Sequence, residues 1–420
     1  MFDYSFPTDA EQIYERILAI DPKRYDQTRN HLDGYVSRLS PYFAHGFLTL
    51  PLVRDALFMS FRPLDCYRFI YELCWREFFS RYMARFGEKA VCTEQEARKS
   101  DLPCLPLLPD KIKSAKTGLK ALDFAFQKLY EAGYMHNHAR MWAAAYTTHY
   151  ARTQWQTGAR LFFFHLLDGD LASNNLSWQW VFGTFSDKVY YFNQDNINKY
   201  SPAEFRDHRN LIDKSYEDLY EDVFVQKIFV DEVGARNPFM PEPEFGEIAG
   251  DTKSEEEVLA LLHQHDDVIY FHEWMLNPML VDEFDSDGKA LKLFIVDRDF
   301  WVKNPASAKR FRFMVDLAKN IPGVVVYLGD PAALLRKAIL KRAETREPLR
   351  VYSQEYFSEN VKNTFTSLRV TRNVNLKVKP FPWLVPHLPV VPNRFGKFFK
   401  LIERELFGQH LPLASQMWRK

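Results

Sequence analysis

The chain has 420 residues, of which 46% are hydrophobic and 16% aromatic. This length allows a large core and predicts more than one domain. Lysine plus arginine equals aspartate plus glutamate, at 55 each. The neutral balance excludes a general attraction to nucleic acid or membranes, so an anionic partner would need a local basic patch.

The first residues, MFDYSFPTDAEQ, carry early acids and no long apolar core, unlike a secretory signal. No apolar run approaches the roughly 20 residues of a membrane span. We therefore expect a cytoplasmic protein without a membrane partner. The cysteines Cys66, Cys74, Cys92 and Cys104 form no CxxC pair, so free core thiols are favoured over a metal cluster or disulfide framework.

The first half of the chain has apolar residues at helical spacing in several stretches. The clearest are 69–85 (FIYELCWREFFSRYMAR), 121–130 and 136–151. The spacing predicts an N-terminal all-helical domain over residues 1–237. The Pro- and acid-rich stretch that follows, 238–257, is typical of a linker.

After the linker the pattern changes to short runs rich in β-branched or aromatic residues, with helical patterns between several of them. The runs are 268–271, 291–296, 324–328 and 349–352, and the helical stretches include 306–319 and 332–342. This alternation predicts a smaller C-terminal α/β domain with a Rossmann-like parallel sheet over 258–405. A tail is expected over 406–420. There is no internal repeat and no Gly-rich phosphate loop.

The segment YELCWREFF places Glu72, Trp75, Arg76 and Phe79 at i, i+3, i+4 and i+7, which is one face of a helix. In the simplest interpretation, Glu72 and Arg76 form a surface ion pair beside a half-buried tryptophan. The same face would also suit a platform that stacks a flat ligand.

The segment HNHARMWAAAY places Asn137, Arg140 and Met141 on one helix face. His136 and His138 are two positions apart and point to opposite sides, which argues against a two-histidine metal chelate. The simplest interpretation is an amphipathic helix with a polar end.

The segment DGDLASNNLSWQW, residues 168–180, combines two acids, two asparagines and two tryptophans. Asp168 and Asp170 could be turn or capping residues, and Trp178 and Trp180 could be core. Buried acids need partners, and the arginines of the two preceding segments are candidates. Three polar and aromatic segments so close together in one chain favour a ligand site.

These segments resemble a known family. SRLSPYFAHG, YELCWREFF, KTGLKALD, AGYMHNHARM and DGDLASNNLSWQW are similar, in this order, to the FAD-binding helical domain of the photolyase and cryptochrome family, over about residues 20–205. VIYFHEWMLNP, KLFIVDRDF, VVVYLGDPAALL and PNRFGKFFK resemble pieces of that family's α/β domain. In the family this domain usually comes first, so the chain resembles a circular permutation.

The resemblance implies a bent FAD held by a set of matched positions. The pyrophosphate region would be contacted by Tyr25, Ser37, Arg38, Leu39 and Ser40. Val36 stands where the family often has threonine. The flavin and ribityl region would be surrounded by Arg76, Asn137, Arg140, Asp168, Asp170 and Asn174, with Asn174 facing flavin N5 and an Arg140–Asp168 pair compensating a buried charge.

The resemblance also implies a substrate cavity and an electron route. The cavity for a flipped cyclobutane pyrimidine dimer would be lined by Glu72, Trp75, Asn137, Met141 and Trp180. DNA contacts would come from Arg29, Trp75, His138 and Trp180, with His138 in place of a common arginine. Trp178 and Trp155 match the first two tryptophans of the photoreduction chain, and the third is missing near Leu102.

We therefore expect a light-dependent flavoenzyme, a cyclobutane dimer photolyase in which excited FADH⁻ passes an electron to a flipped lesion in damaged DNA. The alternatives are a cryptochrome-like blue-light photoreceptor and a flavin-binding structural protein. The intact substrate pocket favours repair. The neutral charge, His138, the missing third tryptophan and the permuted order favour the alternatives. Whether a second, light-harvesting chromophore binds is left open.

Overall fold

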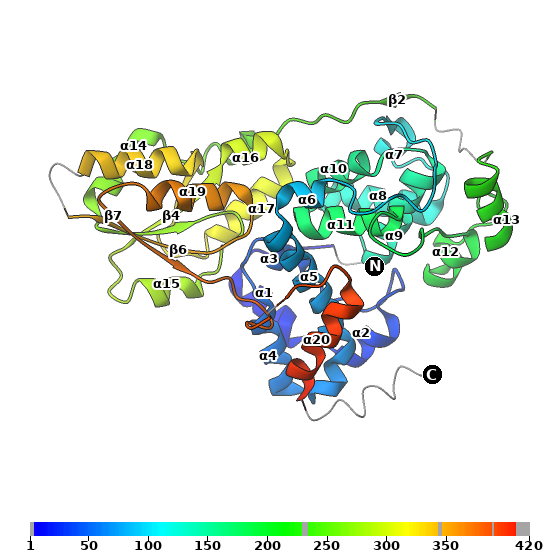
Figure 1. The fold of residues 1–420 in the computed structure, drawn as a ribbon, viewed down its shortest axis with the longest axis horizontal. Helices are drawn as coiled ribbons and strands as arrows, with labels where there is room; N and C mark the ends of the chain where they lie inside the picture. The colour runs from blue at the N-terminus through cyan, green and yellow to red at the C-terminus, as the bar shows by residue number, and fades with distance from the viewer. Residues whose placement is uncertain (1–3, 229–233, 343–346, 389, 409–420) are drawn as a thin grey trace. The chain divides into compact units, whose positions relative to one another are not determined.

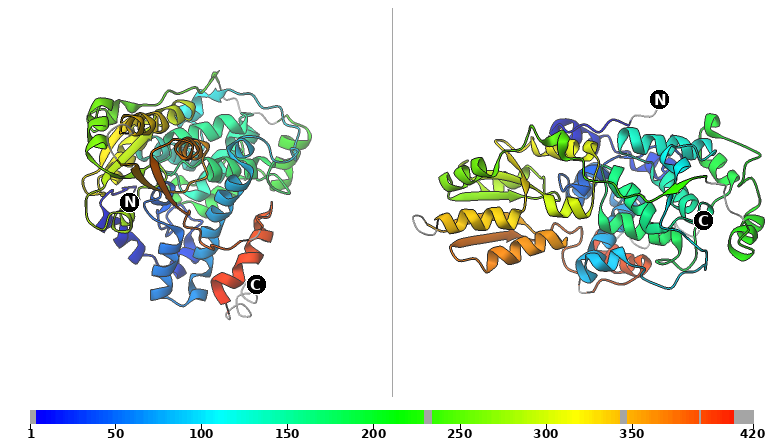
Figure 2. Two further views of the ribbon diagram at one scale, coloured as in Figure 1. Left: turned by 60° about the vertical axis from the view of Figure 1, so that its left-hand side comes forward. Right: turned by 90° about the horizontal axis from the view of Figure 1, so that it is seen from above.

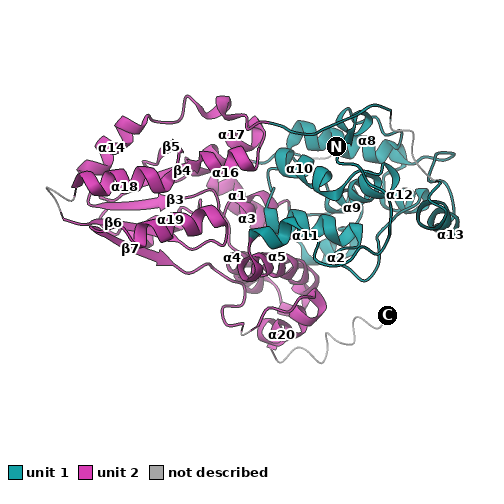
Figure 3. Cartoon of the chain, turned by 45° about the horizontal axis from the view of Figure 1, so that its top comes forward, with its two compact units in different colours: residues 1–6, 21–37, 88–241 teal, residues 7–20, 38–87, 242–420 magenta. Residues whose placement is uncertain are grey.

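The computed structural model describes residues 4–228, 234–342, 347–388 and 390–408. Within these residues, no helix is both long enough and apolar enough to cross a membrane. The chain divides into two compact units, each assembled from separated stretches (Figure 3). We call residues 1–6, 21–37 and 88–241 the helical unit, and residues 7–20, 38–87 and 242–420 the mixed unit.

The helical unit consists mainly of α-helices joined by short turns. Its elements are α2 (Pro22–Thr28), α6 (Glu88–Cys92), β1 (Leu108–Pro109), α7 (Asp110–Lys113), α8 (Lys120–Ala132), α9 (Asn137–Ala145), the π-helical turn η2 (Tyr146–Tyr150), α10 (Trp155–His165), α11 (Leu171–Phe182), α12 (Gln194–Tyr200), η3 (Ala203–Phe205), α13 (Tyr216–Tyr220), η4 (Glu221–Val225) and β2 (Arg236–Asn237). Its core is built around Trp142, Trp155 and Phe126, which are almost completely buried. Helices α8 and α9 confirm two predicted helices, the second of which ends in a π-helical turn.

The mixed unit combines helices from both ends of the described chain with an α/β layer. The helices are α1 (Ala10–Leu18), α3 (Ser40–Ala44), α4 (Leu50–Ser60), η1 (Pro63–Cys66), α5 (Tyr67–Phe86) and α20 (Phe395–Phe407). Helix α5 confirms the helix expected over 69–85. It ends at Gly87, whose φ of 84° is a conformation that suits glycine.

Five parallel strands form the sheet of the mixed unit, in the order β5-β4-β3-β6-β7 (Figures 1 and 2). They are β3 (Asp267–Phe271), β4 (Leu291–Asp297), β5 (Val325–Gly329), β6 (Leu349–Gln354) and β7 (Val374–Lys379), and the connecting helices are α14 (Glu255–Gln264), α15 (Met279–Phe284), α16 (Arg298–Lys303), α17 (Ala308–Ala318), α18 (Pro331–Arg342) and α19 (Glu359–Arg369). The predicted parallel sheet is confirmed. Helices α18 and α19 pack side by side on one face, with α15 on the other (Figure 1).

The expected domain boundaries stay a prediction, and the structure adds two facts about them. The stretches 7–20 and 38–87, which the sequence analysis assigned to the helical domain, belong to the mixed unit. Within the expected linker 238–257, the chain forms the turn η5 (Phe245–Ile248) and the first turn of α14. Most of the expected tail, residues 409–420, lies outside the described residues.

Candidate functional site

The residues expected to hold cofactor and substrate are divided between the two units. The helical unit contains Tyr25, Arg29, Ser37, Asn137, His138, Arg140, Met141, Trp155, Asp168, Asp170, Asn174, Trp178 and Trp180, and the mixed unit contains Arg38, Leu39, Ser40, Glu72, Trp75 and Arg76. The two groups are described in turn, each within its own unit.

An ion pair joins α9 to the segment before α11. Nη2 of Arg140 lies 2.9 Å from Oδ2 of Asp168, and Nε of Arg140 donates to the carbonyl of Met135 at 2.7 Å. The Asp168 side chain is only 3% exposed and that of Arg140 is 23% exposed. The buried carboxylate is therefore compensated by the partner that the sequence suggested.

Two further polar residues, Asp170 and Asn174, hold α11 in place through hydrogen bonds. Asp170 is the N-cap, and its Oδ1 accepts the backbone N–H of Ser173 at 2.7 Å, so the capping interpretation describes this side chain. The buried amide of Asn174 donates to Ala159 O at 2.9 Å and to Asn175 Oδ1 at 3.1 Å. The nitrogen of this amide is therefore engaged within the helical unit.

Trp178 on α11 packs against α10. It is 3% exposed and meets the ring of Phe162 edge to face at 4.9 Å. A Cβ atom on Gly158 would lie 2.3 Å from Cη2 of Trp178, so this contact requires glycine. Trp155, three residues before Gly158 on α10, is also buried. The indole N–H groups of both tryptophans are buried without a hydrogen-bond partner among the described residues.

The side chains at the polar end of α9 differ in how far they are exposed to solvent. Asn137 is exposed and Met141 is half-buried. His138 is buried between Trp142 and Tyr200, with ring centroids 4.9 and 4.5 Å away. Burial lowers the pKa of His138 to about 4, so the ring is neutral at pH 7. A neutral ring brings no positive charge to a phosphate, and the DNA-binding role of His138 stays a prediction.

Three residues of the helical unit remain half-buried at its surface, namely Tyr25 on α2, Arg29 at its C-terminal end, and Ser37. Trp180 is also half-buried, with its ring 5.9 Å from that of Tyr190. Partial exposure leaves each side chain able to contact a ligand.

In the mixed unit, the turn before α3 has an unusual backbone. Arg38 has φ of 53°, a left-handed conformation that residues other than glycine seldom adopt. Leu39 is buried, while Arg38 and Ser40 are half-buried. Such strain often accompanies a functional turn. Nη2 of Arg76 reaches the carbonyl of Ser40 at 3.5 Å and so connects α5 to this turn.

Trp75 on α5 is covered by a ring from the same chain. The ring of Phe395 on α20 stacks on it with centroids 3.7 Å apart and planes inclined by 10°. Glu72 forms an ion pair with Arg68 at 3.8 Å. Phe395 therefore occupies one face of Trp75, and the role of Trp75 as a platform for a flat ligand stays a prediction.

The sequence analysis did not single out Phe395 as a site residue. The signal was present in RFGKFF, where Phe395, Phe398 and Phe399 have the i, i+3, i+4 spacing of an apolar helix face. The sequence analysis also did not identify Glu77. This residue is completely buried, pairs with Arg81 at 2.8 Å and accepts the N–H of Leu384 at 3.1 Å. Burial raises the pKa of Glu77 against the opposing effect of Arg81.

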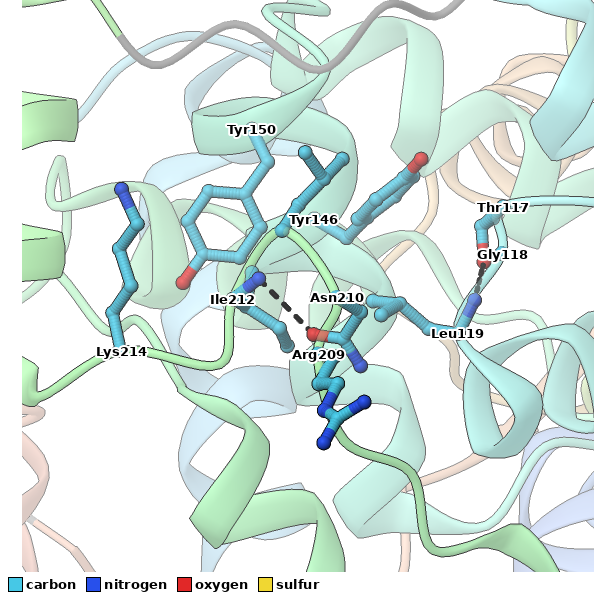
Figure 4. A pocket seen from close by; sticks show the side chains of 10 residues that line it. Thr117, Gly118, Leu119, Tyr146, Tyr150, Arg209, Asn210, Ile212 and Lys214 are labelled. Carbon is cyan, nitrogen blue, oxygen red and sulfur yellow. Dashed lines mark hydrogen bonds between the residues drawn. The ribbon is translucent and has the colours of Figure 1, made fainter.

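An open groove of about 560 Å³ lies elsewhere in the helical unit (Figure 4). It is lined by Thr117, Gly118, Leu119, Tyr146, Tyr150, Arg209, Asn210, Leu211, Ile212 and Lys214. The cation of Lys214 is paired with Asp222 at 2.6 Å. None of the residues expected to hold the cofactor or substrate lines this groove.

The four cysteines are free, with Cys66 and Cys74 buried, Cys104 half-buried and Cys92 exposed. Among the residues that the structure describes, no group of three or more His, Cys, Asp or Glu side chains could hold a metal ion.

Residues 69–211, which include α5 and the segments from α8 to α12, match a family model described as the FAD binding domain of DNA photolyase. Over these residues the chain is similar to the photolyase and cryptochrome family. The resemblance inferred from the sequence is confirmed over this part of the chain, while the permuted domain order stays a prediction. The photolyase-type region contains Arg140, Asp168 and Asn174.

Curated relatives support the same relationship. The deoxyribodipyrimidine photo-lyase of Streptomyces griseus is 35% identical over 169 residues, covering 39% of this chain and 36% of the relative. The photo-lyase of Vibrio cholerae is 32% identical over 171 residues, covering 37% and 34%. The chain thus spans about a third of the length of these photolyases.

Solved structures of the family were also found. A cryptochrome from Synechocystis has a TM-score of 0.42 and 23% identity, covering 48% of this chain and 45% of its own. A class III photolyase from Agrobacterium tumefaciens has a TM-score of 0.39 and 26% identity, covering 45% and 41%.

Proposed function

We propose that the chain is a light-dependent flavoprotein that binds FAD and repairs cyclobutane pyrimidine dimers in DNA. The observation that carries the proposal is the buried Arg140–Asp168 ion pair, with the Asn174 acceptor beyond it on α11, inside the region that matches the photolyase FAD-binding family. A buried ion pair beside an amide acceptor suits a polar, redox-active cofactor better than a core contact.

The chemistry of the available atoms fits the cofactor. The free Oδ1 of Asn174 can accept an N–H, as the reduced flavin ring would offer at N5. The hydroxyls of Ser37 and Ser40 suit phosphate oxygens, as do the N–H groups of this turn. When bound and excited by light, reduced FAD would supply one electron to a substrate. Arg140 and Asp168 would orient the cofactor and keep its surroundings electrically balanced.

The proposed substrate contacts are Glu72, Trp75, Asn137, Met141 and Trp180, with Arg29 on the DNA backbone. Tryptophan faces hold an extruded base by stacking, worth about 1–3 kcal/mol per base. Glu72 and Asn137 would hydrogen-bond the pyrimidine edges. Trp178 and Trp155 would carry electrons to oxidised flavin, a step that repair does not need once the flavin is reduced.

A second candidate function is a blue-light photoreceptor that binds FAD without repair. The contact that favours it is the stack of Phe395 on Trp75, because a dimer can stack on that face only after Phe395 leaves it. Photoreception would need the flavin site but no access to Trp75.

A repair assay separates the two functions. The purified protein, loaded with FAD and reduced, is mixed with an oligonucleotide that carries one thymine dimer and illuminated with blue light. We expect loss of the dimer under light and none in the dark. FAD binding without repair would favour the photoreceptor, and a colourless protein that cannot be loaded with FAD would contradict both. Trp178→Phe should slow photoreduction of oxidised flavin but leave repair by prereduced protein intact.

A further inference from the structure

The outward face of α20 carries three cations. Lys397, Lys400 and Arg404 are at i, i+3 and i+7, within about 60° of one another around the helix, and all three are exposed. Among the described residues, none of the three has an ion-pair partner. Leu401 lies on the same face, and the acid Glu405 lies at its edge.

The opposite face of α20 is fully used in packing against α5. Beyond the stack on Trp75, Phe395 meets Tyr71 at 5.1 Å, Phe399 meets Tyr71 at 4.7 Å and Phe398 meets Phe78 at 5.4 Å. Tyr67 donates a hydrogen bond to Glu403 Oε1 at 2.5 Å. Figure 1 shows α20 alongside α5. Because the apolar face of α20 is buried, only its charged face is accessible to a binding partner.

We propose that the outward face of α20, the helix whose inner face covers Trp75, binds the phosphate backbone of DNA. The proposal rests on the proposed function, in which DNA is the substrate, and adds a contact surface to it. It supplies the local basic patch that a chain of zero net charge needs in order to hold a polyanion.

The geometry of the three cations suits a nucleic acid strand. Along a helix that rises 1.5 Å per residue, Lys397 and Arg404 are about 10 Å apart. Phosphates of one DNA strand follow at about 3.4 Å of helix axis each, so the three side chains span a few successive phosphates. Flexible lysine side chains act as mobile point charges on such a surface.

A phosphate contact of this kind has a defined signature. It contributes affinity that does not depend on sequence or damage, because the backbone is the same everywhere. It also contributes to the salt dependence of binding, by about 0.9 in the slope of log K against log[salt] for each phosphate neutralised.

The test removes the three charges together, as Lys397→Gln, Lys400→Gln and Arg404→Gln. The matched control removes three other exposed cations of the mixed unit, as Lys362→Gln, Arg369→Gln and Arg372→Gln. Binding of undamaged and dimer-containing duplexes is followed by fluorescence anisotropy from about 50 to about 200 mM salt. Far-UV circular dichroism checks that each variant is folded.

We expect the α20 variant to lose about 2–3 in salt slope and to bind both duplexes more weakly by the same factor, while the control matches the wild type. The inference would be overturned if the folded α20 variant had the same salt slope as the wild type. It would also be overturned if the control variant lost as much salt slope as the α20 variant. Charge-dependent binding to anionic vesicles in place of DNA would also overturn it. If the wild type repairs DNA and the α20 variant keeps the wild-type salt slope, the inference about α20 fails and the proposed function stands. If the wild type binds no DNA, the inference and the proposed function both fail.

Discussion

At the scale of single residues, the Arg140–Asp168 pair makes a direct prediction. Asp168→Asn removes the charge that compensates Arg140. Breaking a buried pair costs about 3–5 kcal/mol, and because Arg140 is 23% exposed we expect about 1–3 kcal/mol less stability. Urea unfolding measures the change, and FAD titration measures the expected loss of cofactor affinity.

The neighbouring acid provides the control. Asp170→Asn also removes one negative charge, but asparagine caps a helix about as well as aspartate, so the loss should stay below about 1 kcal/mol. Equal losses in the two variants would show that the effect comes from the general charge of the segment and would contradict a specific role for the pair.

Gly158 makes a second prediction at this scale. In a helix, alanine is normally better than glycine by about 1 kcal/mol. At Gly158, however, the added Cβ would overlap Trp178, and overpacking costs about 1–3 kcal/mol. We expect Gly158→Ala to lower the free energy of unfolding and to shift the near-UV circular dichroism of the tryptophans.

A matched variant tests the cause. Gly396 lies in the first turn of α20, where an added Cβ would meet nothing within 4 Å. Gly396→Ala should therefore be neutral or stabilising by up to about 1 kcal/mol. A stabilising Gly158→Ala would mean that α10 and α11 separate readily, and would remove the argument that glycine holds Trp178 in place.

Residue patterns in the sequence predicted which side chains share a helix face better than which distant side chains they contact. For the Arg140–Asp168 pair, the need of a buried acid for a cation left Arg76 and Arg140 as candidates, and the family resemblance singled out Arg140. The stack of Phe395 on Trp75 could not be inferred, since spacing reveals the faces of α5 and α20 but not that they meet across more than 300 residues. Spacing also could not choose between the two arginines four residues from Glu72: the simplest interpretation paired it with Arg76, whereas the structure shows an ion pair with Arg68.

At the scale of elements, α20 makes the next prediction. Phe395→Leu keeps the bulk but removes the ring that stacks on Trp75, and should cost about 1 kcal/mol. Trp75 should then become more accessible to acrylamide, which quenches tryptophan fluorescence. The contribution of Trp75 is the difference in quenching between the Phe395→Leu variant and the same variant that also carries Trp75→Phe. If Phe395 also limits lesion access, the same variant should bind dimer-containing DNA more tightly.

Phe407→Leu is the control at the other end of the same helix, where the ring contacts Phe58 and Tyr67. It should destabilise α20 without changing the quenching of Trp75. Equal quenching changes in both variants would indicate that α20 detaches as a whole.

Among the elements, strands β3 to β6 and the long helices were predicted, and the edge strand β7 was not. Strands β3, β4 and β5 carry runs rich in β-branched and aromatic residues, and β6 begins with the alternating pattern LRVY, which is typical of a strand. The missed strand β7, VNLKVK, is at the edge of the sheet, and its half-buried positions alternate with exposed ones at its start. Lysines on such a strand protect an open edge, which makes it resemble a loop in sequence.

At the scale of the whole molecule, buried titratable groups set opposite pH limits. Burial lowers the pKa of His149 and of His272 to about 4, against about 6.5 unfolded, so their contribution to stability is complete above pH 6.5 and is lost as the pH falls toward 4. Burial, and then Asp297, raises the pKa of Glu273 to about 8. Its contribution is complete below about pH 4.5 and is lost as the pH rises to 8.

The alkaline limit can be tested with Glu273→Gln. Glutamine keeps the acceptor that binds the N–H of Asp297 at 2.6 Å and Nε1 of Trp301 at 3.1 Å. We expect it to stabilise the protein at pH 8 by on the order of 2–4 kcal/mol, and by much less at pH 5. The exposed Glu256→Gln serves as a control with no change. A constant difference across the pH range would show that Glu273 does not titrate in this window.

The pairing of α5 with α20 also has a consequence for synthesis on the ribosome. Tyr67 and Glu403, which meet between these helices, are 336 residues apart. At about 5–20 residues per second, the aromatic side of α5 would wait roughly 20–70 s for its partner after leaving the exit tunnel. During that time Tyr71, Trp75 and Phe78 form an exposed hydrophobic surface that is prone to aggregation. The nascent chain should therefore need a chaperone until α20 has been synthesised.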